Sequence, residues 1–154
     1  MDQAVARVYG NQVRVRACGI CINEDAILMV NHTGVSTGDF WAPPGGGVAF
    51  GDSIEDTIIR EFKEETGIGV IVGRFLFGCE YIAAPIHSVE LFYEVTHRDG
   101  TVSKGYDPEI QIIKSVAYLT MSEIKSRKAH EVHGVFRFAN SLKDLKSLTG
   151  FHRI

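Results

Sequence analysis

Short runs rich in apolar and β-branched residues recur along this chain, in the pattern that is typical of β-strands. Two of these runs, residues 13–22 and 26–30, are separated only by the polar segment 23–25, which predicts a hairpin. Turn residues such as those at 98–100 separate the later runs. The later runs predict strands at residues 70–77, 88–96 and 115–119.

Residues 53–66 have the pattern of an amphipathic helix. Ile54, Ile58 and Phe62 recur at i, i+4 and i+8 and form an apolar stripe. Gly67 follows as a residue suited to a left-handed cap. A sheet lying between helices is therefore expected, without the regular strand-helix alternation of a doubly wound fold. Two shorter helices are predicted at residues 122–128 and 141–148.

Composition and charge narrow the class of protein. The 154 residues are 45% hydrophobic and 23% charged, which predicts one globular domain over residues 1–154. No apolar run approaches the roughly 18 residues that cross a bilayer. The N-terminus has an acid where a signal peptide has basic residues. We therefore expect a cytoplasmic protein without membrane contacts. A net charge of −3 argues against a long nucleic acid as partner, so any nucleotide ligand is expected to be small.

The three cysteines, Cys18, Cys21 and Cys79, are odd in number, which argues against a complete disulfide framework. Cys18 and Cys21 have the spacing of a zinc or redox pair, but they lie in a predicted strand, where residues three apart point to opposite faces. We therefore interpret these thiols as buried packing residues.

Three carboxylates are the most informative feature of the predicted helix. Glu61, Glu64 and Glu65 stand at i, i+3 and i+4, so they share one face and repel one another. They also crowd the C-terminal end, where the helix dipole disfavours acids by about 0.3–1 kcal/mol each. A divalent cation would reverse both penalties, and oxygen ligands suit Mg²⁺ or Mn²⁺ beside phosphates. The alternative is a solvated face on which Arg60 pairs with Asp56 and Glu64.

A glycine-rich segment precedes this helix. Gly45, Gly46 and Gly47 permit close backbone approach, which suits a loop whose carbonyls or amides face a metal or ligand. From Gly46 onward, residues 46–68 closely resemble the Nudix box, G-x5-E-x7-R-E-U-x-E-E-x-G-U, in which U is a bulky apolar residue. Six of the seven invariant letters match at the family's spacing, and the residues before the box, Phe40-Trp41-x-x-Pro44-Gly45, also resemble that family.

The resemblance to the Nudix hydrolase family implies an α/β/α sandwich with a mixed β-sheet and a loop-helix-loop catalytic motif. It also implies a metal-dependent hydrolase that uses Mg²⁺ or Mn²⁺ to cleave the diphosphate bond of a nucleoside diphosphate derivative, with a small nucleotide substrate and a homodimer. Matching positions give the roles of metal ligand or catalytic base to Glu61, Glu64 and Glu65, with the Gly45 carbonyl facing a metal and Arg60 orienting a glutamate. Gly46, Asp52 and Gly67 are its supporting positions.

Two positions depart from the family pattern. Asp52 replaces the usual glutamate and shortens its reach, and the aromatic Phe62 stands where an aliphatic residue is commoner. Outside the box, Glu109 is a candidate for a further metal ligand, with an exposed turn acid as the alternative. His130 and His133 have the spacing of zinc ligands but lack partners, so packing or surface roles are favoured. Trp41 either stacks on a base or anchors the sheet.

Two other functional classes remain as alternatives. A Nudix-fold module that senses a nucleotide without cleaving it would usually have lost acids of the box, whereas all three late glutamates are present. An isomerase acting on isoprenoid diphosphates would need its own cysteine and glutamate placement, for which the sequence shows no convincing match. The substrate-binding residues are not identified by the sequence.

Overall fold

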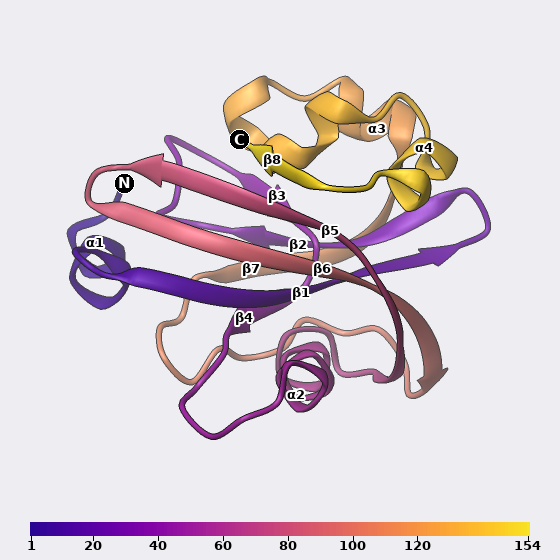
Figure 1. The fold of residues 1–154 in the computed structure, drawn as a ribbon, viewed down its shortest axis with the longest axis horizontal. Coiled ribbons are helices and arrows are strands. Elements are labelled where there is room, and N and C mark those ends of the chain that lie inside the picture. The colour runs from indigo at the N-terminus through magenta and orange to yellow at the C-terminus, as the bar shows by residue number, and fades with distance from the viewer.

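A mixed β-sheet forms the centre of this computed structural model, which describes all residues 1–154 (Figure 1). Helices lie on both faces of the sheet, as predicted. The strands are β1 (Val13–Asn23), β2 (Ala26–His32), β3 (Phe40–Ala42), β4 (Gly45–Gly47), β5 (Gly69–Ala83), β6 (Ile86–Asp99), β7 (Ile113–Thr120) and β8 (Phe151–Arg153). The helices are α1 (Gln3–Tyr9), α2 (Ile54–Thr66), α3 (Met121–Lys125) and α4 (Leu142–Ser147), with 3₁₀ turns η1 (Ala129–Glu131) and η2 (Gly134–Phe138).

Strand β1 connects the two halves of the sheet. The strand order is β3-β2-β1-β6-β5-β8, with β4 also pairing with β1 and β7 with β2. The pairs β1–β6 and β5–β8 are parallel and the others are antiparallel. In the β1–β4 pair, Arg16 lies opposite Gly47 and Cys18 lies opposite Gly45. This pairing brings the glycine-rich segment against the middle of the sheet.

Each face of the sheet has its own apolar core. Helix α2 covers one face, where Ile58 and Phe62 are fully buried in a cluster of eight residues. The C-terminal layer of α3, η1, η2 and α4 covers the other face, in a cluster of 16 buried residues. Burying a side chain of the size of Phe62 stabilises the fold by about 1.5–3 kcal/mol. Cys18 belongs to the second cluster and Cys21 to the first, so the two thiols point to opposite faces, as predicted.

Helix α2 begins and ends where its sequence predicts. The Ser53 side chain accepts a hydrogen bond from the Asp56 amide at the N-terminus, and Gly67 closes the helix with a left-handed φ of 76°. The stripe of Ile58 and Phe62 faces the sheet, which leaves the acidic face free. This helix is therefore fixed by local signals and then oriented by its buried face.

Several elements differ from the sequence predictions. The glycine segment is the short strand β4 and not a loop, because its backbone pairs with β1 where a side chain would collide. The helix predicted at 122–128 ends at Lys125, and Lys128 is already extended. Helix α1 and the short strands β3 and β8 were not predicted.

None of the helices has the length and hydropathy needed to cross a bilayer.

Candidate active site

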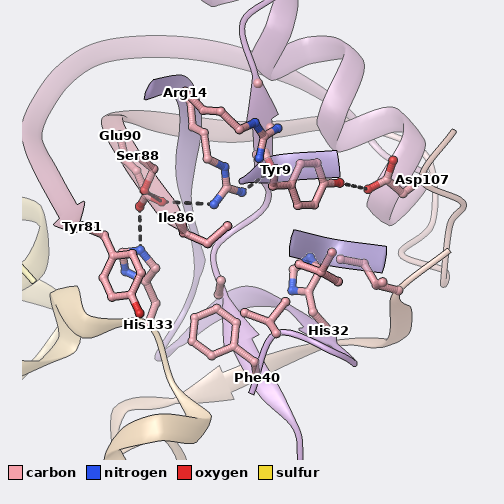
Figure 2. A pocket seen from close by; sticks show the side chains of 18 of the residues that line it. Tyr9, Arg14, His32, Phe40, Tyr81, Ile86, Ser88, Glu90, Asp107 and His133 are labelled. Atoms are coloured by element: carbon pink, nitrogen blue, oxygen red, sulfur yellow. Dashed lines mark hydrogen bonds and ion pairs between the residues drawn. The ribbon is translucent and has the colours of Figure 1, made fainter. Parts of the chain in front are cut away.

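The acidic face of α2 borders a cavity of about 420 Å³ that also reaches β1, β4, β6 and the C-terminal layer. Figure 2 shows this cavity from close by. The predicted site residues that line it are Gly45, Gly46, Arg60, Glu61, Glu64, Glu65 and Glu109.

Glu65 is the most buried of the three box carboxylates, with 4% of its side chain exposed. Its Oε2 accepts a hydrogen bond of 3.0 Å from the Gly45 amide, and its Oε1 lies 3.6 Å from His32 Nε2. The Gly45 carbonyl accepts a hydrogen bond of 2.9 Å from Arg16 Nη2. The start of β4 is therefore held between an acid of α2 and a cation of β1.

Arg60 joins the other two carboxylates. Its Nη1 donates to Glu61 Oε1 at 2.9 Å and to Glu64 Oε2 at 3.1 Å. Burial and then the charge of Glu65 raise the pKa of Glu61 to about 7. The pairing of Arg60 with Asp56 that a purely solvated helix face would have is not formed, because Asp56 bonds with Ser53 at the N-terminus. The face is thus organised around the cavity.

Gly46 is required by this arrangement. A Cβ atom added at Gly46 would overlap the carboxylate of Glu61. Because that carboxylate is the far end of a flexible side chain, a residue larger than glycine at position 46 would displace it, so the present position of the Glu61 carboxylate depends on Gly46.

The donor chemistry fits a divalent cation. Three carboxylates on one helix face provide the oxygen ligands that Mg²⁺ and Mn²⁺ favour. Burial, and then the charge of Glu65, raises the pKa of Glu61 and so disfavours its ionised form, a cost that a bound cation would offset. The carboxylates do not converge into a ready cluster that could hold an ion, since Arg60 holds Glu61 and Glu64 while the Gly45 amide holds Glu65. A cation would thus compete with Arg60 for the same oxygens.

A second polar group in the cavity consists of Glu90 and Arg16, which the sequence analysis did not identify, and His133, for which it favoured a packing or surface role. Glu90 of β6 is 3% exposed and accepts hydrogen bonds from Arg16 at 3.1 Å and from His133 at 2.6 Å (Figure 2). His133 Nδ1 accepts from the Val135 amide, so its Nε2 carries the proton that Glu90 accepts. Burial alone would raise the pKa of Glu90, but His133 and Arg16 lower it to about 2.

A signal for this group was present in β6. Ser88, Glu90 and Phe92 alternate on the buried side of the strand, so Glu90 is a charge on an inward face. A buried charge needs a partner. The partners, Arg16 and His133, lie 74 and 43 residues away in the chain, so local spacing could not reveal them.

The other predicted residues lie apart from the cavity or on its rim. Glu109 is on the rim, where its half-exposed carboxylate is 3.7 Å from Arg14 Nη2. Asp52 and Gly67 do not line the cavity; Asp52 precedes the cap of α2, and Gly67 ends that helix. Trp41 is buried in the core under Arg127, which favours the structural role.

Comparisons with known proteins agree with this geometry. A family model described as NUDIX domain matches residues 11–138. The curated protein "Uncharacterized Nudix hydrolase YvcI" of Bacillus subtilis (strain 168) is 50% identical over 32 residues, which are 21% of this chain and 20% of that protein. The chain therefore aligns with about a fifth of the length of this curated relative.

Solved structures share the fold at low sequence identity. The MutT NUDIX hydrolase from Burkholderia pseudomallei has a TM-score of 0.63 and 22% identity, covering 73% of this chain and 86% of that chain. An ADP-ribose pyrophosphatase from Streptococcus suis has a TM-score of 0.61 and 18% identity, covering 90% and 98%. A MutT protein from Bacillus halodurans has a TM-score of 0.65 and 20% identity, covering 90% and 89%.

Proposed function

This chain belongs to the NUDIX domain family, and we propose that it is a metal-dependent hydrolase. Its substrate would be a nucleoside diphosphate linked to another moiety, and water would attack phosphorus to cleave the diphosphate bond. The observation that carries the proposal is the face of α2 on which Glu61, Glu64 and Glu65 border a cavity beside β4.

The three glutamates of α2 would hold Mg²⁺ or Mn²⁺, together with the Gly45 carbonyl and Glu109. When bound, the ion would neutralise diphosphate oxygens and lower the pKa of a water molecule. The Gly45 amide orients Glu65, and Arg60 orients Glu61 and Glu64.

Glu61 is the candidate for accepting a proton. Burial raises its pKa to about 7 in the metal-free chain, so Glu61 would serve as the base where the ion is held by the other acids. Where Glu61 itself binds the ion, its pKa would fall and Glu65 would be the alternative base. The Glu61 side chain is 12% exposed, so it is reached from the cavity and protected from bulk solvent. Asp52 and Gly67 would support the site by starting and ending α2 in the correct place.

The cavity also has an apolar part that suits a nucleoside. Phe40, Tyr81 and Ile86 line this part (Figure 2). An aromatic and apolar wall beside polar groups is the usual setting for a small organic ligand. We therefore propose a small nucleotide as the partner; a cytoplasmic location and a homodimer remain predictions.

A nucleotide-sensing module without turnover is the second candidate. The ion pairs of Arg60 with Glu61 and Glu64 give it some support, because they occupy oxygens that a cation would use. The retention of all three acids on a cavity favours the hydrolase.

The test is a panel of nucleoside triphosphates, nucleotide sugars, ADP-ribose and dinucleoside polyphosphates, each with Mg²⁺, Mn²⁺ or excess EDTA. The fold is shared with a UDP-X diphosphatase and an ADP-ribose pyrophosphatase of known structure, which supports this choice of panel. We expect turnover of at least one class with metal and loss of turnover with EDTA. Binding without release of phosphorylated products would favour the sensing module, and turnover that survives exhaustive chelation would contradict the metal requirement.

A further inference from the structure

Part of the cavity wall comes from a segment that the family model does not match. The family model covers residues 11–138, whereas Met1 and, in α1, Val5 and Tyr9 line the cavity. A wall outside the part shared with the family can give this chain a contact with its ligand that the box does not provide.

Helix α1 is fixed in place by contacts at both ends. The Asp2 amide donates a hydrogen bond of 2.7 Å to the Gly34 carbonyl, and Val5 is 3% exposed. At the other end, the Tyr9 hydroxyl donates to Asp107 Oδ2 at 3.4 Å (Figure 2). Tyr9 is therefore held at the edge of the cavity by its own polar tip.

The ring of Tyr9 holds the guanidinium of Arg14. The centre of that guanidinium lies 3.9 Å from the ring centroid, which is cation–π geometry. The one ion pair of Arg14 is long, 3.7 Å to Glu109, and no hydrogen bond within the protein uses its N–H groups. Arg16, by contrast, already donates to two protein acceptors. Arg14 is thus a partly buried, oriented cation with its donors free.

The position of Arg14 relates it to the box. Arg14 and Arg16 are two apart on β1, so they extend to the same side of the strand and both line the cavity. A Cβ atom added at Gly47 would lie 2.9 Å from Arg14 Nη2, which places the guanidinium directly over β4. Glu61 borders the same cavity. A phosphate group held beside the box acids is therefore within the region that Arg14 faces.

We propose that Arg14 is a phosphate-binding residue of this site and that Tyr9 of α1 is the positioning residue that holds its guanidinium. A planar guanidinium can donate two parallel hydrogen bonds to phosphate oxygens. Stacking on Tyr9 restrains Arg14 before the ligand arrives, which reduces the entropy lost on binding. The inference rests on the proposed function, because the phosphate is taken to be that of the substrate.

The test uses inorganic pyrophosphate as the probe and isothermal titration calorimetry with Mg²⁺ present. We expect Arg14→Gln to weaken binding about tenfold or more, because a charge-assisted pair of hydrogen bonds is lost. Arg7→Gln is the matched control, since Arg7 is an exposed arginine of α1 that does not line the cavity. It removes the same charge and should bind pyrophosphate as the wild type does.

Two substitutions at Tyr9 test the positioning role. Tyr9→Phe keeps the ring under Arg14 and loses the bond to Asp107, so we expect a change of less than about threefold. Tyr9→Leu removes the aromatic face and should weaken binding about fivefold, with KM for the substrate rising while kcat stays within about twofold. Circular dichroism of each variant checks that the fold is retained, and Tyr9→Phe keeps the comparison informative should Tyr9→Leu unfold α1.

The assignment is overturned if wild-type protein does not bind pyrophosphate, if Arg14→Gln binds it with unchanged affinity, or if Arg7→Gln weakens it equally. The calorimetry measures pyrophosphate binding and does not depend on turnover. The proposed role of Arg14 and the proposed hydrolase function can therefore fail independently of each other. A protein that binds pyrophosphate through Arg14 and hydrolyses nothing in the panel contradicts the proposed function alone. A working hydrolase whose Arg14→Gln variant keeps the wild-type KM and affinity contradicts the role of Arg14 alone.

Discussion

At the scale of single residues, the charge state of Glu61 links stability to pH. Its pKa is raised by burial and by Glu65 to about 7 in the folded chain, against an ordinary value of 4.5. Between these two pH values the folded protein holds a proton that the unfolded chain releases. The free energy of unfolding of the metal-free protein should therefore fall as pH rises from 4.5 to 7, by up to about 3 kcal/mol.

Urea unfolding in EDTA across this pH range measures the effect. Glu61→Gln should remove most of the slope, because the amide does not titrate. Saturating Mg²⁺ should also flatten it in the wild type, since a cation favours the ionised carboxylate. A slope that is the same in Glu61→Gln and wild type would assign it to other groups.

Substitution of Glu64 distinguishes a catalytic role of this acid from a role in stabilising the fold. Glu64→Gln keeps the side-chain volume but removes a charge, so metal-dependent turnover should fall at least about tenfold. The stability of the metal-free protein should change by less than about 0.5 kcal/mol, because the lost pair with Arg60 is partly exposed and the helix dipole penalty is relieved. Glu55→Gln is the control, since Glu55 is an acid in the first turn of the same helix. Wild-type kinetics in Glu64→Gln would remove this acid from the mechanism.

At the scale of secondary structure, local signals explain which elements could be predicted. Helix α2 carries its own cap, stripe and stop, so its bounds follow from neighbouring residues. Helix α1 has a cap at Asp2 but is only seven residues long with a single buried side chain, so it depends on distant contacts such as that of Tyr9 with Asp107. Strand β8 has three residues and depends on β5, where Phe151 pairs with Gly78. Three glycines have little strand propensity, so β4 exists because β1 accepts its backbone. The shared face of the three box carboxylates could be predicted because it follows from local spacing on α2. The group around Glu90 could not, because its members are distant in the chain.

The contact between β4 and α2 can be tested by a substitution at Gly46. Gly46→Ala would place a methyl group where the Glu61 carboxylate lies, so either the side chain or the strand must move. Since the carboxylate can swing aside, we expect a loss of less than about 1 kcal/mol in stability. Because Glu61 is displaced, we expect turnover to fall at least about tenfold. Gly38→Ala, in the loop before β3, has open space for its methyl group and should affect neither. Normal turnover in Gly46→Ala would show that the position of Glu61 is not critical.

At the scale of the whole molecule, the bond between Glu90 and His133 joins the central sheet to the C-terminal layer. Glu90 belongs to β6 and His133 precedes η2, so a bond between two residues 43 apart in the chain connects the two layers. Both are about 5% exposed or less. The Glu90 carboxylate accepts from both His133 and Arg16, and Arg16 also donates to the Gly45 carbonyl of β4, so the same bond helps to keep Arg16 facing β4. Packing of the C-terminal layer and the geometry of the candidate site are therefore coupled.

The last prediction compares this pair with one on the surface. His133→Ala leaves Glu90 buried without one of its donors, which should cost about 3 kcal/mol and lower Tm by about 6–12 °C in a chain of this size. Lys114→Gln breaks the pair of Lys114 with Asp39, which has the same length of 2.6 Å but is largely exposed. It should cost less than about 1 kcal/mol, because water replaces the lost partner. Thermal unfolding of the two variants measures the difference. Equal losses would mean that the length of the pair, and not its burial, determines what it contributes, and the coupling between the layers would then need another source.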